Sequence, residues 1–200
     1  MEKLFKKMEE YGHANHVPII NENGLKVLLD TVRKYKPKRV LEIGTAIGYS
    51  ALQIAANAAE GVEITTLELS EERARLARSF MEESPYNSQI TILTGDAGKL
   101  LEEISGSYDF VFIDAAKGQY PDYFRKIQPY LADDAVIAAD NVLFRGYVRG
   151  GVEAPRRFRT IVKRLREYLS MVENNPEYTT SIYDNGDGLA VSVRRKDSND

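Results

Sequence analysis

Three oxygen-bearing side chains stand where two apolar runs of the chain end, and their types are those of a hard-cation site. Asp114 follows one run, and Asp140 and Asn141 follow the next. Two carboxylates and an amide favour Mg²⁺ or another hard divalent cation over zinc. Such a cation can bind a substrate hydroxyl and lower its pKa. Lys117, three residues after Asp114, is a candidate general base, with a solvated surface lysine as the alternative.

The segment 40–50, Val-Leu-Glu-Ile-Gly-Thr-Ala-Ile-Gly-Tyr-Ser, joins an apolar run to a helical pattern through two glycines. Gly44 and Gly48 lack a Cβ, so the backbone there can turn sharply and approach a ligand closely. Their spacing differs from the GxGxxG pattern of dinucleotide-binding proteins. A carboxylate at Glu42 also suits a cationic ligand better than a pyrophosphate. The segment predicts a pocket for a cationic ligand, and an ordinary strand-to-helix turn is the alternative.

Two further acids follow predicted strands. Glu68 lies 24 residues after Gly44, where a carboxylate can accept hydrogen bonds from a ribose diol. Asp96 follows the next strand, within reach of an exocyclic amine of a bound base. Any one of these residues is also explained as a helix cap or turn residue. Capping alone does not explain why such residues follow all of the first five predicted strands.

The elements that must position these residues alternate between strands and helices. This pattern predicts an α/β fold, with a Rossmann-like, doubly wound, mostly parallel seven-stranded sheet and one antiparallel edge strand. Ligands bind such sheets beyond the carboxyl ends of the strands. The expected strands are 39–44, 62–68, 89–94, 108–113, 134–139, 177–183 and 188–194, and the expected helices are 1–12, 22–35, 49–59, 71–83, 97–104, 120–130 and 155–170.

Length and composition predict one domain over 1–200, with an N-terminal helical cap (1–36), a Rossmann-like core (37–195) and a frayed tail (196–200). The chain is 43% hydrophobic and contains no cysteine, which excludes disulfides and thiolate metal sites. No apolar run approaches the roughly 18 residues of a membrane span, and the charged N-terminus does not resemble a signal peptide. We therefore expect a cytoplasmic protein without membrane contact.

Basic residues are concentrated in one window of a chain whose net charge is −3. Only Glu153 opposes them there. The window predicts contact with a polyanion, or else the solvated face of an amphipathic helix. Its basic residues are Arg145, Arg149, Arg156, Arg157, Arg159, Lys163, Arg164 and Arg166.

Five motifs, in this order along the chain, resemble those of the cation-dependent, catechol-type O-methyltransferases that use S-adenosylmethionine. The resemblance runs from about residue 17 to 195, and the motifs are specific together although each is weak alone. It implies the fold of the class I methyltransferases, and the family's members are usually homodimers. The motifs are Val-Leu-Glu-Ile-Gly-Thr-Ala-Ile-Gly-Tyr-Ser (40–50), Thr-Leu-Glu (66–68), Gly-Asp-Ala (95–97), Phe-Ile-Asp-Ala-Ala-Lys-Gly-Gln-Tyr (112–120) and Ala-Asp-Asn-Val-Leu (139–143).

The resemblance implies a role for each motif. The first motif would hold the methionine part of the cofactor. Glu68, the acid of the second motif, would bind the ribose of the cofactor, and the third motif would contact its adenine. Mg²⁺ would be held by Asp114, Asp140 and Asn141, with Lys117 as the general base and Asp114 also catalytic. The methyl group would move in line from sulfur to an acceptor oxygen. The implied cofactor-binding residues are Glu42, Gly44, Gly48, Ser50, Glu68, Asp96, Ala97 and Asp114.

Within that family, the segments 15–19, 141–152 and 153–159 look most like the bacterial tRNA 5-hydroxyuridine methyltransferases, which form 5-methoxyuridine at the wobble position. The implied partner is the tRNA anticodon loop, whose phosphates the basic window would contact. Small-molecule members share every catalytic motif, so a catechol or caffeoyl-type phenol is the alternative substrate. A third alternative is a protein that binds the cofactor but has no catalytic activity. The candidate RNA-binding residues are Arg145, Arg149, Arg156, Arg157 and Arg159.

Overall fold

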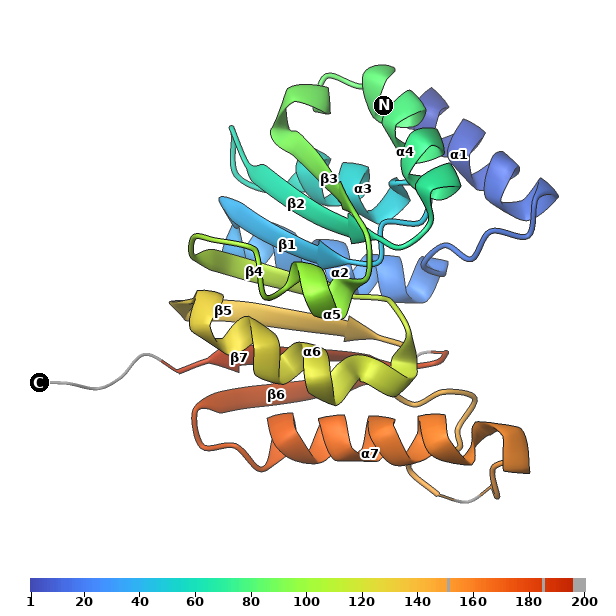
Figure 1. The fold of residues 1–200 in the computed structure, drawn as a ribbon, viewed down its shortest axis with the longest axis vertical. Coiled ribbons are helices and arrows are strands. Elements are labelled where there is room, and N and C mark those ends of the chain that lie inside the picture. The colour runs from blue at the N-terminus through green and yellow to red at the C-terminus, as the bar shows by residue number, and fades with distance from the viewer. Residues whose placement is uncertain (151, 185, 196–200) are drawn as a thin grey trace, which may run out of the picture.

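A seven-stranded sheet forms the middle layer of the computed structural model, which describes residues 1–150, 152–184 and 186–195 (Figure 1). The strand order is β3-β2-β1-β4-β5-β7-β6. The chain begins at the centre of the sheet, builds outward to β3, and then returns to build the other half. The strands are β1 (Arg39–Ile43), β2 (Glu63–Glu68), β3 (Ile90–Thr94), β4 (Tyr108–Ile113), β5 (Leu131–Asp140), β6 (Tyr178–Tyr183) and β7 (Leu189–Arg194).

The pairing confirms the predicted doubly wound, mostly parallel sheet. The first five strands pair with one another in parallel, whereas β7 is antiparallel to both β5 and β6. The antiparallel strand therefore lies one position in from the edge, because β7 and not β6 pairs with β5. The expected tail, 196–200, lies outside the described residues.

Helices cover both faces of the sheet. Apolar residues of α1 to α4 pack with one face in one buried cluster, and those of α6 and α7 pack with the other face in a second cluster. In Figure 1, α5 and α6 lie in front of the sheet and α7 lies below β6, with α2 and α3 behind the sheet. Within the described ranges, no helix is both long and apolar enough to cross a membrane. The helices are α1 (Glu2–Ala14), α2 (Glu22–Tyr35), α3 (Tyr49–Asn57), α4 (Glu71–Glu82), α5 (Ala97–Leu100), α6 (Tyr120–Ile127) and α7 (Arg159–Glu173).

The predicted helices differ from these mainly at their ends. The α6 helix stops at Ile127 and a 3₁₀ turn containing Pro129 follows, because proline has no N–H to continue the helical hydrogen bonds. The α7 helix begins at Arg159 and not at Pro155, since a separate 3₁₀ turn, Arg156–Phe158, comes first. The second difference places the candidate residues Arg156 and Arg157 in the 3₁₀ turn and not in the expected helix.

Two contacts bring the carboxyl ends of the central strands together. Gly44, just after β1, has φ +104°, and a Cβ built on it would lie 2.1 Å from the carbonyl oxygen of Asp114. The hydroxyl of Tyr120, at the start of α6, lies 3.3 Å from the carbonyl oxygen of Ile113 and 3.0 Å from that of Asp140. The first contact joins β1 to β4, and the second joins β4 to β5.

We expect Gly44→Ala to lower the free energy of unfolding by roughly 3 kcal/mol or more, because a positive φ and a steric overlap both oppose a side chain there. Gly61→Ala is the matched control. Gly61 has φ +71°, but a Cβ there would meet nothing within 4 Å. It should lose only about 1–2 kcal/mol. Urea unfolding of both variants measures the difference, and equal losses would contradict the close approach.

A second pair of variants tests a buried hydroxyl. Tyr168, on α7, is fully buried, and its hydroxyl has no hydrogen-bond partner among the described residues. Tyr168→Phe should therefore raise the free energy of unfolding by about 1 kcal/mol, because it removes a desolvated polar group. Tyr120→Phe should lower it by a similar amount, since it removes a satisfied hydroxyl. A loss of stability in Tyr168→Phe, measured by thermal unfolding, would show that the hydroxyl has a partner.

Candidate active site

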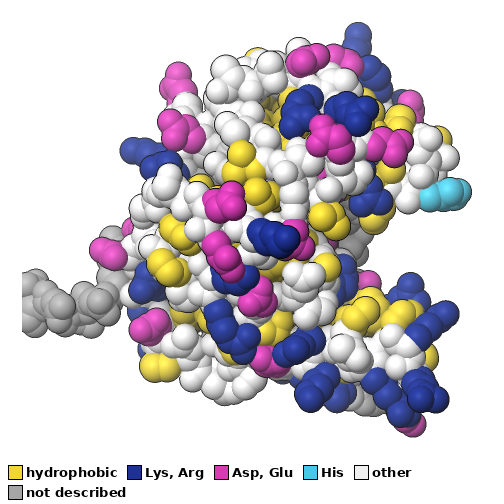
Figure 2. All heavy atoms as spheres, in the orientation of Figure 1, with side chains coloured by type: hydrophobic (Ala, Val, Ile, Leu, Met, Phe, Trp, Pro, Cys, Tyr) yellow, Lys and Arg dark blue, Asp and Glu magenta, His cyan; other side chains and the backbone are white. Residues whose placement is uncertain are grey.

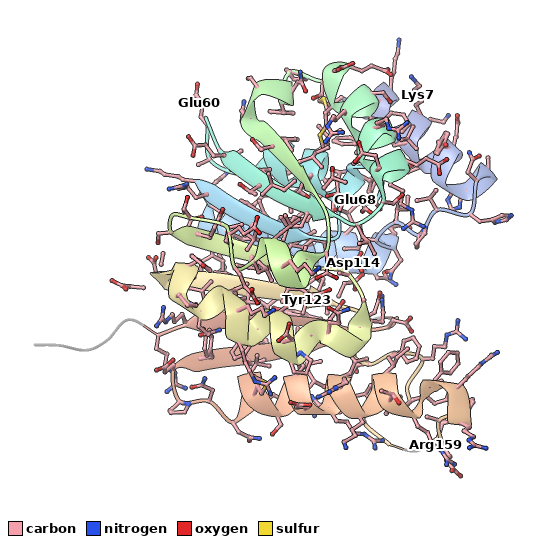
Figure 3. All side chains as sticks on the ribbon, viewed as in Figure 1. Lys7, Glu60, Glu68, Asp114, Tyr123 and Arg159 are labelled. Atoms are coloured by element: carbon pink, nitrogen blue, oxygen red, sulfur yellow. The ribbon has the colours of Figure 1, made fainter. Side chains whose placement is uncertain are left out.

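A cavity of about 360 Å³ opens beyond the carboxyl ends of the parallel strands. Its wall brings together most of the residues that the sequence predicted. Figure 3 shows Glu68 and Asp114 at this end of the sheet, with Tyr123 on the neighbouring α6. The predicted residues that line the cavity are Gly44, Ser50, Glu68, Asp96, Ala97, Asp114, Lys117, Asp140 and Asn141.

Two predicted residues lie behind the wall. Glu42 is completely buried. Gly48 caps the start of α3 and faces α4, where an added Cβ would lie 2.7 Å from the terminal methyl of Met81. Gly48 thus lets α3 approach α4 closely, which sets the position of the helix that carries Ser50.

The carboxylate of Glu68 is held by the backbone on both sides. Its Oε2 accepts a hydrogen bond from the N–H of Ala46 (2.8 Å), and its Oε1 accepts one from the N–H of Ser70 (2.9 Å). These bonds tie the loop after β1 to the loop after β2 and fix the carboxylate in the wall. Each oxygen retains a further lone pair, so the group can also accept from a ligand diol.

Glu42 bonds to two hydroxyl groups. Its Oε1 accepts from Ser50 Oγ, and its Oε2 accepts from Thr66 Oγ1, both at 2.5 Å. Burial raises the pKa of Glu42 to about 7, although these two hydrogen bonds oppose the shift. Thr66 also lies 2.6 Å from the hydroxyl of Thr45. Since Ser50 and Thr45 both line the cavity, Glu42 reaches its wall through two hydroxyls.

Two carboxylates lie close together in the part of the wall formed by β4 and β5. Burial, followed by the neighbouring charge of Asp114, raises the pKa of Asp140 to about 7. Burial also raises the pKa of Asp114, while the charge of Lys117 opposes that shift. Both ionised carboxylates would be stabilised by a cation between them. The described residues contain no group of three His, Cys, Asp or Glu that could hold a metal ion. A third protein ligand would therefore be a neutral oxygen, and the amide of Asn141 lies beside Asp140 in the same wall.

Hydrogen bonds to the turn before β7 hold the loop that contains Asn141. The N–H of Val142 donates to the carbonyl of Gly188 (3.1 Å), and the N–H of Leu143 donates to that of Asp187 (2.8 Å). Asn141 itself has φ +56°, a left-handed conformation that asparagine tolerates better than most residues. Its N–H donates to Oδ1 of Asp140 (2.8 Å), so the two predicted ligands are held together.

Sequence reasoning missed part of the wall. The segment 18–21 enters the cavity from the connection between α1 and α2, which is far from the strand ends in sequence. Tyr123 lies one turn into α6, and burial raises its pKa to about 12. Leu69 is 72% exposed although it is hydrophobic. It lines the cavity next to Glu68, and its position directly after that predicted residue was the available signal.

The five candidate RNA-binding arginines lie outside this wall. Four of them lie around the start of α7, whereas Arg149 reaches the last residue of that helix. Arg149 pairs with Glu173 (2.8 Å) and Arg159 with Glu153 (2.9 Å). Arg145 and Arg157 lie instead over the ring of Phe158, at 5.4 and 4.7 Å from its centroid, and Arg156 is exposed. Figure 2 shows Lys and Arg side chains gathered over this region, and Figure 3 shows Arg159 well away from Asp114.

Glutamates outside the basic window reduce its charge. Besides the pair at Arg149, the C-terminal half of α7 supplies Glu167, which pairs with both Arg164 and Arg125. Part of the window is therefore the solvated, ion-paired face of a helix, as the alternative interpretation expected. The arginines around Phe158 are the part that this interpretation leaves unexplained.

Comparisons with known proteins agree with this geometry. The family model described as O-methyltransferase matches residues 2–196. A "Caffeoyl-CoA O-methyltransferase" of Stellaria longipes is 32% identical over 62% of this chain, which spans about half (53%) of that relative's length.

Two solved structures match over nearly the whole chain. A putative caffeoyl-CoA O-methyltransferase from Staphylococcus aureus has a TM-score of 0.87 and 33% identity, covering 95% of this chain and 91% of that one. The O-methyltransferase from Bacillus cereus, solved in complex with SAH, has a TM-score of 0.86 and 26% identity, covering 96% and 91%. The chain therefore belongs to the O-methyltransferase family, as an S-adenosylmethionine-dependent enzyme.

Proposed function

We propose that the enzyme methylates one of two neighbouring oxygens on an aromatic acceptor of the catechol or caffeoyl type, with Mg²⁺ at Asp114, Asp140 and Asn141. The observation that carries this proposal is the pair of carboxylates in the cavity wall, the buried Asp140 and the half-buried Asp114, beside an amide and Lys117. Two vicinal oxygens can share one cation, which would select such acceptors. The Stellaria and Staphylococcus proteins, whose names specify a caffeoyl acceptor, support the same substrate class.

The cofactor would lie along the wall between Ser50 and Asp96. In this arrangement Glu68 accepts from the ribose hydroxyls, and Asp96 and Ala97 contact the adenine. Gly44 allows the backbone to approach the methionine part closely, and the Ser50 hydroxyl lies at that end. The cavity lining supports this placement because it contains all five residues.

The chemical step forms a bond between the acceptor oxygen and the methyl carbon and breaks the bond between that carbon and the sulfonium sulfur. When bound, the divalent cation lowers the pKa of the acceptor hydroxyl and fixes its position. Lys117, in the same wall, is the proposed acceptor of the proton of that hydroxyl. The segment 18–21 covers the cavity on the side of α2 and helps exclude water.

We expect chelation to abolish methyl transfer to a catechol and Mg²⁺ to restore it. Asp140→Asn should lower kcat/KM on the order of 100-fold or more, because it removes a charged ligand of the cation. Its affinity for S-adenosylhomocysteine should stay within a few-fold of the wild type, since the cofactor lies on other residues. Labelled S-adenosylmethionine and calorimetry measure the two quantities. Full turnover in excess EDTA would remove the metal from the mechanism.

A second candidate acceptor is 5-hydroxyuridine at the tRNA wobble position. Its 5-hydroxyl and 4-carbonyl are also vicinal oxygens, and an anticodon base is already unstacked from a duplex. The observation that favours it is the aromatic cluster of Phe144, Tyr147 and Phe158, with ring centroids 5.2 to 6.3 Å apart and Arg145 and Arg157 over it. Such rings and guanidinium groups can stack on bases and contact phosphates.

Two double variants separate the candidates. If tRNA is the acceptor, Arg145→Ala with Arg157→Ala should lower kcat/KM for hydroxylated tRNA about tenfold or more and flatten its salt dependence. Arg149→Ala with Arg159→Ala removes the same charge from ion-paired residues and should have a smaller effect. Turnover of free catechol, but not of tRNA with or without 5-hydroxyuridine, would establish the small-molecule acceptor.

We further propose that the enzyme works as a cytoplasmic homodimer, as the family resemblance implies. The cysteine-free sequence fits a reducing compartment. Sedimentation analysis of the full chain tests the dimer.

A further inference from the structure

We propose that Glu42 is a positioning residue that sets the hydrogen-bond polarity of the cavity wall and couples cofactor binding to the release of a proton. When Glu42 is ionised, Ser50 and Thr45 have only lone pairs to offer to the cavity. When it is protonated, one of these hydroxyls becomes a donor. This inference rests on the proposed placement of the cofactor's amino-acid end beside Ser50.

The geometry supplies a branched chain of hydrogen bonds with Glu42 at its centre. One branch runs from Glu42 directly to Ser50, and the other runs through Thr66 to Thr45. Glu42 and Thr66 are completely buried, Thr45 is 1% exposed and Ser50 is 9% exposed. Water therefore does not compete for the two inner groups, and their hydrogen-bond directions depend on one another.

When Glu42 is ionised, the donor and the acceptor of each hydrogen bond in this network are fixed. A carboxylate only accepts hydrogen bonds, so Ser50 and Thr66 both donate to Glu42. Thr66 has a single hydroxyl proton, which is then committed, so Thr45 must donate in its 2.6 Å contact with Thr66. Both cavity-lining hydroxyls have thus turned their protons inward, and each can only accept from a ligand.

Protonation of Glu42 reverses one branch. The protonated carboxyl donates to Ser50 or to Thr66, and the receiving hydroxyl must direct its own proton elsewhere. Ser50 would direct it toward the cavity. Thr66 would direct it toward Thr45, whose proton would then be displaced to the cavity. Either outcome replaces an acceptor with a donor at the wall.

The cofactor's amino-acid end makes this difference consequential. That end carries an α-carboxylate, which only accepts hydrogen bonds, and an α-ammonium group, which only donates them. The proposal places the ammonium against Ser50 and Thr45, so it needs acceptors there. It therefore binds the ionised state of Glu42 more tightly, and binding must lower the pKa of that carboxyl. In the free protein, burial raises the pKa of Glu42 to about 7, with smaller contributions from the charges of Asp114 and Glu68. Both protonation states are then populated near neutral pH.

The experiment measures the affinity for S-adenosylhomocysteine by calorimetry between pH 6 and 8, in excess Mg²⁺. This ligand carries the ammonium group without the sulfonium charge. Wild-type Kd should fall about tenfold as the pH rises, because the competent ionised fraction grows through the pKa near 7. Buffers of different ionisation enthalpy should show the release of about half a proton at pH 7.

Glu42→Gln is the decisive variant, because its amide always donates to one branch and so imitates the protonated state. Its Kd should be well over tenfold weaker than the wild type at pH 8 and independent of pH. Glu68→Gln is the matched control. It removes another carboxylate at the cavity, so it should weaken binding but keep the pH dependence. Thermal unfolding at both pH values checks that each variant is folded.

The outcomes distinguish a failure of the proposed cofactor site from a failure of the role proposed for Glu42. If the wild-type protein does not bind S-adenosylhomocysteine, the proposed cofactor site fails. If the wild type binds it and Glu42→Gln keeps the wild-type pH dependence or the wild-type affinity, the cofactor site stands and the role of Glu42 is overturned.

Discussion

The close approach of the loops after β1 and β4 is the constraint on which the rest of the site depends. The backbone at Gly44 lies so near the carbonyl of Asp114 that a Cβ would overlap with it. This contact puts the turn proposed for the cofactor against the strand end proposed for the metal. The bonding of Tyr120 to the end of β5 then brings Asp140 to the same place. A methyl donor and an acceptor oxygen can meet only if these ends converge.

The same convergence concentrates negative charge in a buried region. Burial raises the pKa of both Asp114 and Asp140, and the charge of Asp114 adds to the shift at Asp140. Glu42 lies behind the cavity wall with its own raised pKa. Such an arrangement costs stability if all the groups are ionised. It is useful where positive ligands arrive, and both the sulfonium cofactor and a divalent cation are positive. Under the proposed function, the cost in stability would be offset by affinity for these positive ligands.

The sequence predicted the fold and most of the wall because parallel sheets place strand ends, and hence the residues after them, at one edge. It did not predict that Glu42 lies behind the wall, since a strand residue's side chain can face the cavity or the interior of the fold. The segment 18–21 was missed because its approach depends on packing of α2 and not on its residue types. The partial neutralisation of the basic window was missed for a similar reason, because Glu173 lies outside the window and meets Arg149 only in the folded chain.

The attachment of the Asn141 loop to the turn at 187–188 has a consequence for how the enzyme matures. The ribosome makes β5 and its terminal carboxylate well before it makes that turn. Until residues 187 and 188 have emerged, Val142 and Leu143 have no partners for their N–H groups, and the amide of Asn141 is not yet positioned. A nascent chain that has not yet reached residues 187 and 188 can therefore hold the proposed cofactor residues in place while the proposed metal ligands are not yet fixed.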